Sequence, residues 1–182
     1  DVFLTAIGQL GLHTLSRTLR SGETRLAQAE LCAEIHFVRK NPGYAKFALE
    51  LELPDPFFYA MDKTIDVRTV SSSPFVWTHA NVGSAPATAM VITMEGPLSN
   101  PILRNRNNGI WIQYVGTIAN GESIVLDTKH FTCLQGEDNM ISIVKHGGDA
   151  YWMILDAGSN SMELETDVIG GSVTLAYFPA FY

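Results

Sequence analysis

The sequence is poor in the residues that hold small proteins together covalently or through a metal. It has 182 residues but two cysteines, Cys32 and Cys133, about a hundred residues apart and with no CxxC motif around either. Disulfide scaffolds and zinc sites need several ligands at short spacings. We therefore expect two separate, buried and reduced thiols. The five histidines show no HExxH or His-x-His spacing, so the sequence predicts no metal site.

Long apolar runs and export signals are also absent from the sequence. No apolar run reaches the roughly 18 residues that a membrane-spanning helix needs, and there is no signal-peptide pattern and no Asn-x-Ser/Thr sequon. These absences predict a soluble intracellular protein without membrane insertion. The first residue is Asp1 rather than methionine, so we expect that the chain was processed or that its beginning is missing.

Positive charge is scarce. Twelve lysines and arginines stand against nineteen aspartates and glutamates, which gives a formal net charge of -7. Residues 61–182 hold twelve of the acidic side chains but six of the basic ones. An acidic surface repels a phosphate backbone, so we expect no specific nucleic-acid binding.

The sequence has enough apolar residues to form a core, and their distribution in short segments predicts strands. Hydrophobic residues make up 46% of the chain, and from about Lys63 onward short apolar segments alternate with Gly, Pro and Asn. Short strands at such spacing, with no long helical pattern between them, predict a sandwich or barrel of antiparallel sheets. The expected strands cover residues 65–71, 75–81, 87–95, 101–105, 109–115, 122–127, 130–135, 140–143, 152–155, 161–166 and 172–177.

The start of the chain has a different period. From Leu4 to Leu19 apolar residues recur at three- and four-residue steps, which predicts a short helix over residues 12–20 that ends at Gly22. An irregular linker is the alternative interpretation.

From Thr24 the apolar period changes to two. With Asn41-Pro42-Gly43 as a turn, residues 24–53 predict a two-stranded hairpin with one apolar face. An isolated hairpin is marginally stable in water, so this one is expected to pack on upstream strands or on a neighbouring subunit. The prolines of Pro54-Asp55-Pro56 then interrupt regular structure. We place a domain boundary there, between residues 1–60 and a β-sandwich domain over residues 61–182.

Patterns of catalytic residues are missing. The sequence has no GxGxxG, GxxxxGK[ST] or GxSxG motif. The densest polar cluster, from Asp127 to His130, lies between two apolar segments, where a solvated hairpin turn is favoured over an active site. Acidic residues such as Glu95 and Glu122 could form a glycosidase pair, but any acidic β-protein offers such pairs. We therefore predict no catalytic residue and no cofactor.

The three tryptophans are the remaining candidates for a binding site. An aromatic ring on a sheet face can stack on a sugar, but Trp77, Trp111 and Trp152 each lie in an apolar stretch, which favours burial. A tryptophan exposed on a sheet beside polar groups would support glycan stacking. Burial of all three would exclude it.

The turn motifs of the second domain, taken in order, resemble the C-terminal domain of distal tail and related minor tail proteins of long-tailed bacteriophages. The series runs through NVGSAPA (81–87), GPLSNP (96–101), Asn108-Gly109, Asn120-Gly121-Glu122, VLDT (125–128), Trp152, LDAGSN (155–160) and an aromatic strand at Tyr177. Ala157 stands where the family has proline, a departure that affects one turn. The structural turn residues by this resemblance are Asn81, Gly83, Asn100, Pro101, Gly121, Asp127, Gly158 and Asn160.

The resemblance implies a belt-like N-terminal β domain, of which residues 1–60 would be the latter part, followed by a galectin-like jelly roll. It also implies a virion protein of the tail tip, assembled in the host bacterial cytoplasm as a homo-oligomeric ring, a hexamer. Its partners would be the tail tube, the tape-measure protein and other tail-tip or baseplate proteins. The residues expected at the ring interface are Leu31, Ile35, Phe37, Phe47, Leu49 and Leu51.

Two function classes stay open. The first is a distal tail or baseplate hub protein that joins the tail tube to the host-recognition apparatus without catalysis. The second is a carbohydrate-binding module for host surface glycans, and a wall or polysaccharide hydrolase is a distant third. If a ring encloses the path of DNA, acidic side chains facing its lumen would repel phosphates and let the duplex slide.

Overall fold

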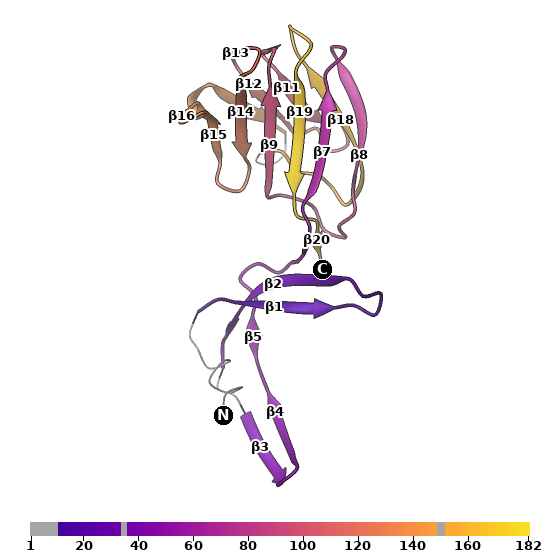
Figure 1. The fold of residues 1–182 in the computed structure, drawn as a ribbon, viewed down its shortest axis with the longest axis vertical. Helices are drawn as coiled ribbons and strands as arrows, with labels where there is room; N and C mark the ends of the chain where they lie inside the picture. Colours follow the sequence, from indigo (N-terminus) through magenta and orange to yellow (C-terminus); the bar gives the residue numbers. More distant parts are fainter. Residues whose placement is uncertain (1–10, 34–35, 149–151) are drawn as a thin grey trace. The chain divides into compact units, whose positions relative to one another are not determined.

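The computed structural model describes residues 11–33, 36–148 and 152–182. The chain divides into two compact units, unit 1 with residues 1–61 and Tyr182, and unit 2 with residues 62–181. Antiparallel strands form both units (Figure 1), and the described residues contain no α-helix. The prediction of a mainly-β chain is confirmed.

Unit 1 is built on a hairpin of two strands, β1 (His13–Thr18) and β2 (Thr24–Leu31), which pair antiparallel over all of β1 and residues 24–29 of β2. The short strand β6 (Phe58–Ala60) pairs with the other edge of β2. The sheet of unit 1 is therefore held by contacts between residues about 35 positions apart in the sequence, such as Arg25 and Ala60.

The helix predicted over residues 12–20 is wrong, because β1 occupies that segment. In β1 the side chains of His13 and Leu15 are half-buried while Thr14 is exposed, which is the two-residue alternation of a strand. Leu15 and Leu19, four residues apart, lie on one face of a strand as well as on one face of a helix. Pairing with β2 makes the segment a strand and not a helix, and the local apolar period cannot reveal that pairing.

The hairpin predicted over residues 24–53 is present, with each of its strands in two pieces. The first strand consists of β2 and β3 (His36–Asn41), and the second of β4 (Tyr44–Ala48) and β5 (Leu51–Glu52). β3 pairs with β4, and β2 pairs with β5. At the turn, the Asn41 side-chain oxygen accepts a 3.0 Å hydrogen bond from the Gly43 N–H. We name residues 24–53 the hairpin arm.

The segment that follows the arm is closed by Asp55. One carboxylate oxygen accepts the Phe57 N–H at 3.3 Å, and the other accepts the Tyr59 hydroxyl at 2.6 Å. Burial and the adjacent Asp55 carboxylate raise the pKa of Tyr59, so this phenol stays protonated and keeps donating. The Asp-Pro-aromatic segment is thus a turn fixed by its own side chain.

Unit 2 is an antiparallel β-sandwich, and Figure 1 shows its sheets as two layers. The six-stranded sheet has the order β16 (Asp138–Asn139), β15 (Thr132–Gln135), β14 (Ser123–Asp127), β9 (Met90–Glu95), β19 (Ser172–Tyr177) and β7 (Thr64–Thr69). The five-stranded sheet has the order β17 (Val144–Gly147), β12 (Trp111–Tyr114), β11 (Ile102–Asn105), β18 (Gly158–Glu165) and β8 (Phe75–Asn81). Short elements complete the chain: β10 (Leu98–Ser99), β13 (Thr117–Ile118), η1 (Ile141–Ile143) and β20 (Ala180–Phe181).

The core lies between the two sheets because each strand turns alternate side chains inward. β9 buries Ile92 and Met94, and β12 buries Ile112. Burying a side chain of this size stabilises the fold by roughly 1.5–3 kcal/mol. Other buried members of the same cluster are Leu98, Leu103, Ile118, Ile124, Leu126, Met153, Leu155, Leu164, Leu175 and Tyr177. The predicted antiparallel sandwich is confirmed.

Two expected strands are wrong. Residues 141–143 form the single 3₁₀ turn η1, which follows a hydrogen bond from the Ile141 N–H to the Asn139 side-chain oxygen. Residues 152–155 form a mostly buried loop, in which Leu155 makes an isolated antiparallel bridge with Ala87 outside the sheets. The side chains of this loop pack in the core and are therefore apolar, so the segment has the composition of a buried strand.

One of the two cysteines also differs from expectation. Cys133 is buried as predicted, but Cys32 is exposed and its thiol donates to the Glu50 carbonyl at 3.3 Å. Both thiols are free. Cys32 lies at the end of β2 in the hairpin arm, where few apolar side chains are available to cover it.

Candidate functional site

Asn160 is the centre of a buried asparagine network in unit 2. Its side-chain oxygen accepts the Asp156 N–H at 2.8 Å and the Asn105 amide at 2.9 Å. Its amide donates to the carbonyls of Asp156 at 2.9 Å and Gly158 at 3.1 Å. The side chain is fully buried, and these four bonds use its full hydrogen-bonding capacity. Asn160 therefore closes the loop that leads into β18.

Asn105 at the end of β11 and Asn108 in the connection to β12 bind the same loop. Asn105 donates to the Ile154 carbonyl at 2.9 Å, and Asn108 donates to that carbonyl at 3.2 Å and to the Asp156 carboxylate at 3.1 Å. These amides occupy the carbonyl that a neighbouring strand would otherwise bind. Residues 152–155 are thus fixed to the β11–β12 connection by side-chain amides at Ile154 and Asp156. The sequence analysis did not identify Asn105 as a structural residue. The three asparagines within residues 105–108 were the signal that could have indicated it.

Asn81 and Gly83 fix a second turn. The Asn81 side-chain oxygen accepts the Gly83 N–H at 3.0 Å, and its amide donates to the carbonyls of Ala85 and Asp156 at 3.1 and 3.3 Å. A Cβ atom on Gly83 would lie 2.4 Å from the Ala180 carbonyl oxygen. Only glycine fits at this close approach of two backbones.

The other predicted turn residues also contact the protein's own backbone. Asn100 has a φ of +48° and accepts the Gly116 N–H at 3.1 Å, and the buried Pro101 offers its carbonyl to Tyr114 at 3.1 Å. Gly121 and Gly158 have φ of +83° and +86°, a region that favours glycine. The eight residues therefore do not converge on one cavity but are distributed over several turns.

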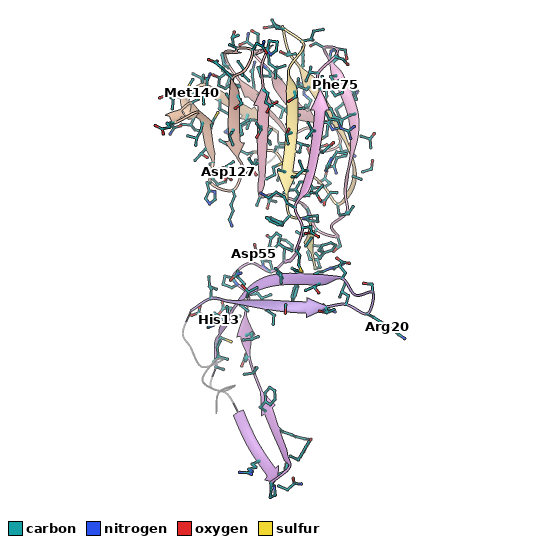
Figure 2. All side chains as sticks on the ribbon, in the orientation of Figure 1. His13, Arg20, Asp55, Phe75, Asp127 and Met140 are labelled. Carbon is teal, nitrogen blue, oxygen red and sulfur yellow. The ribbon has the colours of Figure 1, made fainter. Side chains whose placement is uncertain are left out.

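Asp127 ends β14 (Figure 2) and organises the turn that follows it. One oxygen accepts the N–H groups of Lys129 and His130 at 2.8 and 3.1 Å, and the other lies 2.7 Å from His130 Nδ1. Partial burial by itself raises the pKa of Asp127, but the hydrogen bonds from His130 and Lys129 outweigh it and lower the pKa. The arrangement supports the solvated-turn interpretation, because both carboxylate oxygens are already used locally.

Two of the three tryptophans are buried. Trp77 is 8% exposed and donates its indole N–H to Asp66 at 3.2 Å. Trp152 is 6% exposed and packs edge-on against Phe131 with ring centroids 5.7 Å apart. Neither ring is exposed on a sheet face, as stacking on a sugar there would require.

Trp111 has a different environment on the outer face of the five-stranded sheet. Its strand neighbour Ile112 points into the core, and Trp111 itself is half-buried. The indole lies across Gly147 on β17, where a Cβ atom would come within 2.7 Å of the ring nitrogen. On the other side Trp111 pairs in register with Arg104, whose guanidinium binds the Glu163 carboxylate at 2.8 Å. An aromatic ring and an ion pair thus share one row of this face.

A buried polar cluster connects the two sheets at β7, β8 and β19, and the sequence analysis missed it. His79 Nδ1 lies 2.8 Å from the Asp66 carboxylate, and His79 Nε2 lies 2.8 Å from the Tyr177 hydroxyl. The Asp66 carboxylate also lies 2.7 Å from the Arg68 guanidinium. Polar residues at inward-facing positions of three separate strands were the signal, but only the fold shows that they meet.

The ionisation of this cluster follows from its surroundings. Burial raises the pKa of the Asp66 carboxyl, but the His79 hydrogen bond and the Arg68 charge outweigh burial, so the pKa is lowered. Burial and the Asp66 charge raise the pKa of Tyr177 to about 12. Because His79 is 4% exposed, no substrate can reach it, and the cluster is a structural tie between sheets.

The predicted ring-interface residues lie along the hairpin arm. Register places Leu31 opposite Leu51 and the backbone of Phe37 opposite Phe47. Phe47 is 52% exposed and Leu51 is 37% exposed, while Leu31 and Leu49 are half-buried. Ile35 and the side chain of Phe37 lie outside what the structure describes. Two further apolar side chains on the arm, Val38 and Tyr44, are each 51% exposed.

Unit 1 has little interior of its own. Among its side chains that the structure describes, the buried ones are Ala27 and Ala29. Two alanines supply only a small part of the apolar burial that folding needs. The larger apolar side chains of the arm that the structure describes are exposed or half-buried in the single chain.

Unit 2 has a shallow cavity of about 460 Å³, lined by Phe131, Ile141, Val144, His146 and Trp152. Its lining offers one titratable side chain and no nucleophile. Over the described residues there is no group of three or more His, Cys, Asp or Glu side chains that could hold a metal ion. Within the same ranges no helix is long and apolar enough to cross a bilayer.

Together these observations define a two-unit, mainly-β chain whose larger unit is an antiparallel sandwich stabilised by side-chain-bonded turns. No protein-family model and no curated protein matches the chain. Among solved structures it is similar to the crystal structure of the SPP1 Dit protein, with a TM-score of 0.53 at 10% identity over 96% of this chain and 90% of that chain. That protein is described as a paradigm of the hub adsorption apparatus in phages that infect Gram-positive bacteria. At this identity the likeness shows a shared fold.

Proposed function

We propose that this chain is a distal tail protein, a structural hub subunit at the tail tip of a long-tailed bacteriophage. In this proposal unit 1 is the ring-forming belt domain and unit 2 is a galectin-like domain. The ring, a hexamer, joins the tail tube to the host-recognition apparatus and performs no catalysis. The partners are further copies of the chain, the tail tube, the tape-measure protein and other baseplate proteins.

The observation that carries the proposal is the likeness to the SPP1 Dit fold across 96% of the chain, which includes both units. A β-sandwich by itself hosts many functions. The likeness extends to the sheet with the hairpin arm that precedes the sandwich, and the turn motifs of residues 81–177 resemble the same family.

The arm supplies the physical argument for a ring. Val38, Tyr44 and Phe47 are each about half exposed, and unit 1 buries few side chains of its own. Apolar surface of this kind is stabilised when it is covered by a neighbouring copy. A contact from the arm of one copy to a different surface of the next copy is heterologous, and such contacts form a ring when the rotation from copy to copy closes.

Two measurements on the full chain test this proposal. Light scattering gives the mass of the assembly in solution, and negative-stain imaging shows its shape. We expect closed rings. Val38→Lys or Phe47→Lys on the arm should reduce the assembly, because each buries an unpaired charge at the interface. Val76→Lys is the matched control, since Val76 is a 46% exposed valine on a strand of unit 2.

A chain that stays monomeric at all accessible concentrations and is missing from purified virions would overturn the proposal. Rings that are equally stable with Val38→Lys, Phe47→Lys and Val76→Lys would overturn the role of the arm.

Trp111 favours a second candidate function, carbohydrate binding. It is the one tryptophan of the three that is not buried, and it shares a sheet row with the ion pair of Arg104 and Glu163. A ring for stacking beside groups that bond hydroxyls is what sugar recognition needs. Trp111→Ala should abolish retention of the chain on host cell-wall polysaccharide. Phe131→Ala, which removes a 52% exposed aromatic elsewhere, should leave retention unchanged, and retention that survives Trp111→Ala would exclude this site.

A further inference from the structure

The sequence has two Asn-Gly pairs, and the structure gives them opposite surroundings. They are Asn108-Gly109 and Asn120-Gly121. Asparagine is a thermolabile residue, and it is most reactive before glycine, because a residue without a Cβ atom lets its backbone nitrogen approach the asparagine side chain. The reaction also needs a free side-chain amide and a glycine N–H that can lose its proton. A hydrogen bond from either group hinders the reaction.

Asn108-Gly109 is protected by hydrogen bonds. The half-buried Asn108 amide donates to the Ile154 carbonyl at 3.2 Å and to the Asp156 carboxylate at 3.1 Å. The Gly109 N–H donates to the Asn105 carbonyl at 2.9 Å. Both reacting groups of this pair are therefore occupied, and these bonds must open before the reaction can start.

Asn120-Gly121 has no such protection. The pair lies between β13 and β14 at one end of the sandwich (Figure 1), and both residues are exposed. Across the described part of the chain, neither the Asn120 side chain nor the Gly121 N–H makes a hydrogen bond. A Cβ atom on Gly121 would meet no other atom within 4 Å. The turn therefore has room for a ring to close between the two residues.

We infer that Asn120 is a site of spontaneous deamidation and isoaspartate formation. The Gly121 nitrogen gives its proton to hydroxide and attacks the Asn120 Cγ atom. A new C–N bond closes a succinimide ring, while the bond from Cγ to the amide nitrogen breaks and ammonia leaves after taking a proton from water. A second water molecule then adds to either carbonyl of the ring and breaks its C–N bond. The products are aspartate and isoaspartate, and water is the only co-reactant.

The new carboxylate appears where the sandwich is already acidic. Residues 95–101, 115–122 and 165–171 form loops that are joined to one another by backbone hydrogen bonds and bridges. They contain no lysine, arginine or histidine. Their exposed acidic side chains are Glu95, Glu122, Glu165 and Asp167. The product therefore meets like charges and no counter-charge at this end.

Isoaspartate also lengthens the main chain, which then runs through the side-chain carbons of the modified residue and gains a methylene group. The turn has little space for this. The Glu122 N–H donates to the Ala119 carbonyl at 3.0 Å, and Ile118 is completely buried in β13. A Cβ atom on Gly96 would clash with the Ala119 carbonyl, so the two backbones are already in contact. Isoaspartate formation therefore opens the turn.

Incubation of the full chain at 37 °C and pH 8 tests the inference. Isoelectric focusing should show an acidic shift of a single charge per chain. The tryptic peptide 107–129 contains both Asn-Gly pairs, and its fragment masses separate them. In the folded chain Asn120 should react at least about tenfold faster than Asn108, whose hydrogen bonds must open first. In concentrated urea the two sites should react at similar rates, because the structure that separates them is lost.

Asn120→Gln is the matched variant, because its longer side chain closes a ring with the next nitrogen much more slowly. It should abolish the acidic shift of the folded chain. Asn139→Gln, at an exposed asparagine that precedes methionine, should leave the shift unchanged. Methylation by an isoaspartyl methyltransferase should detect the isoaspartate in the aged chain and not in aged Asn120→Gln. Thermal melting verifies that each variant folds.

Hydrogen exchange tests the opening of the turn. Exchange over residues 117–122 should be faster in the aged chain than in Asn120→Asp, which carries the charge without the extra methylene. Equal exchange would overturn this second step. A folded chain in which Asn120 keeps its amide, or in which Asn108 reacts as fast as Asn120, would overturn the inference as a whole. Neither result bears on ring formation, so the proposed function stands or falls separately.

Discussion

The imidazole of His79 on β8 lies 2.8 Å from the hydroxyl of Tyr177 on β19 and so ties one sheet of the sandwich to the other. Both groups are almost completely buried, at 4% and 1% exposed. In a medium of low polarity such a bond is strong when made and costly when broken on one side. The stability of unit 2 should therefore depend on it.

Tyr177→Phe removes the hydroxyl and leaves His79 Nε2 buried without its partner. We expect the free energy of unfolding to fall by about 1–3 kcal/mol, measured by urea unfolding at pH 7. Tyr44→Phe is the matched control, because Tyr44 is 51% exposed on the arm and should change stability by less than about 0.5 kcal/mol. Equal stabilities for the two variants would contradict the role of the tie.

Asp66 should make the stability of unit 2 dependent on pH. Its pKa in the folded chain is lower than the ordinary value of 3.8. The ionised carboxylate therefore stabilises the fold fully above that ordinary value, and this contribution is lost as the pH falls through the lowered pKa. Asp66→Asn lacks the contribution at every pH.

The difference in free energy of unfolding between the wild type and Asp66→Asn should be present at pH 7 and at pH 5 and should shrink below about pH 4. Urea unfolding at a series of pH values measures it. Asp62→Asn, which changes an exposed carboxylate four residues earlier, is the control. A difference that stays the same down to pH 2.5 would show that Asp66 acts through its shape and not through its charge.

Asn160→Ala should destabilise unit 2 more than Tyr177→Phe. The substitution removes the side-chain partner of the Asp156 N–H and of the Gly158 carbonyl, and it removes one of two bonds from the Asn105 amide and from the Asp156 carbonyl. We expect a loss of about 2–4 kcal/mol, because more than one buried group becomes unsatisfied. Asn120→Ala at an exposed turn position is the control. Differential scanning calorimetry measures both, and a loss below about 1 kcal/mol for Asn160→Ala would mean that water replaces the network.

The two thiols should react at very different rates. Cys32 is exposed, whereas Cys133 is buried and its burial raises the pKa of the thiol to about 11. A thiolate-specific reagent should therefore label one cysteine in the folded chain at pH 7.5 and both in concentrated urea. Cys32→Ser should abolish the fast reaction. Rapid labelling of Cys133 in the folded chain would show that β15 opens.

The sandwich could be predicted because the sequence signals for its strands and turns lie within each segment. Residues 172–177 and 90–95 are short apolar segments that end at turns with their own Gly, Pro and Asn signals, and in the structure their burial alternates residue by residue. The hairpin arm was predictable for the same reason, since Asn41-Pro42-Gly43 separates two segments of matching period.

The errors arose where a distant partner decides the outcome. Leu15 and Leu19 fit a helix locally, and β2 makes the segment a strand. The apolar run at residues 152–155 has the composition of a strand, but it is a loop that is fixed by side-chain amides from Asn105 and Asn108. Asp66 and Tyr177 are more than a hundred residues apart, so nothing in either segment indicates that His79 joins them.

The place of β19 has a consequence for when the protein folds. This strand, residues 172–177, lies between β9 and β7 and supplies the hydrogen bonds to both. Until it has been synthesised, β7 has no neighbour in its sheet and β9 has one open edge. Pairing across about a hundred residues is slow to form. The growing chain therefore cannot complete its sandwich on the ribosome until Tyr177 has emerged, and copies that meet before then meet as incomplete sheets.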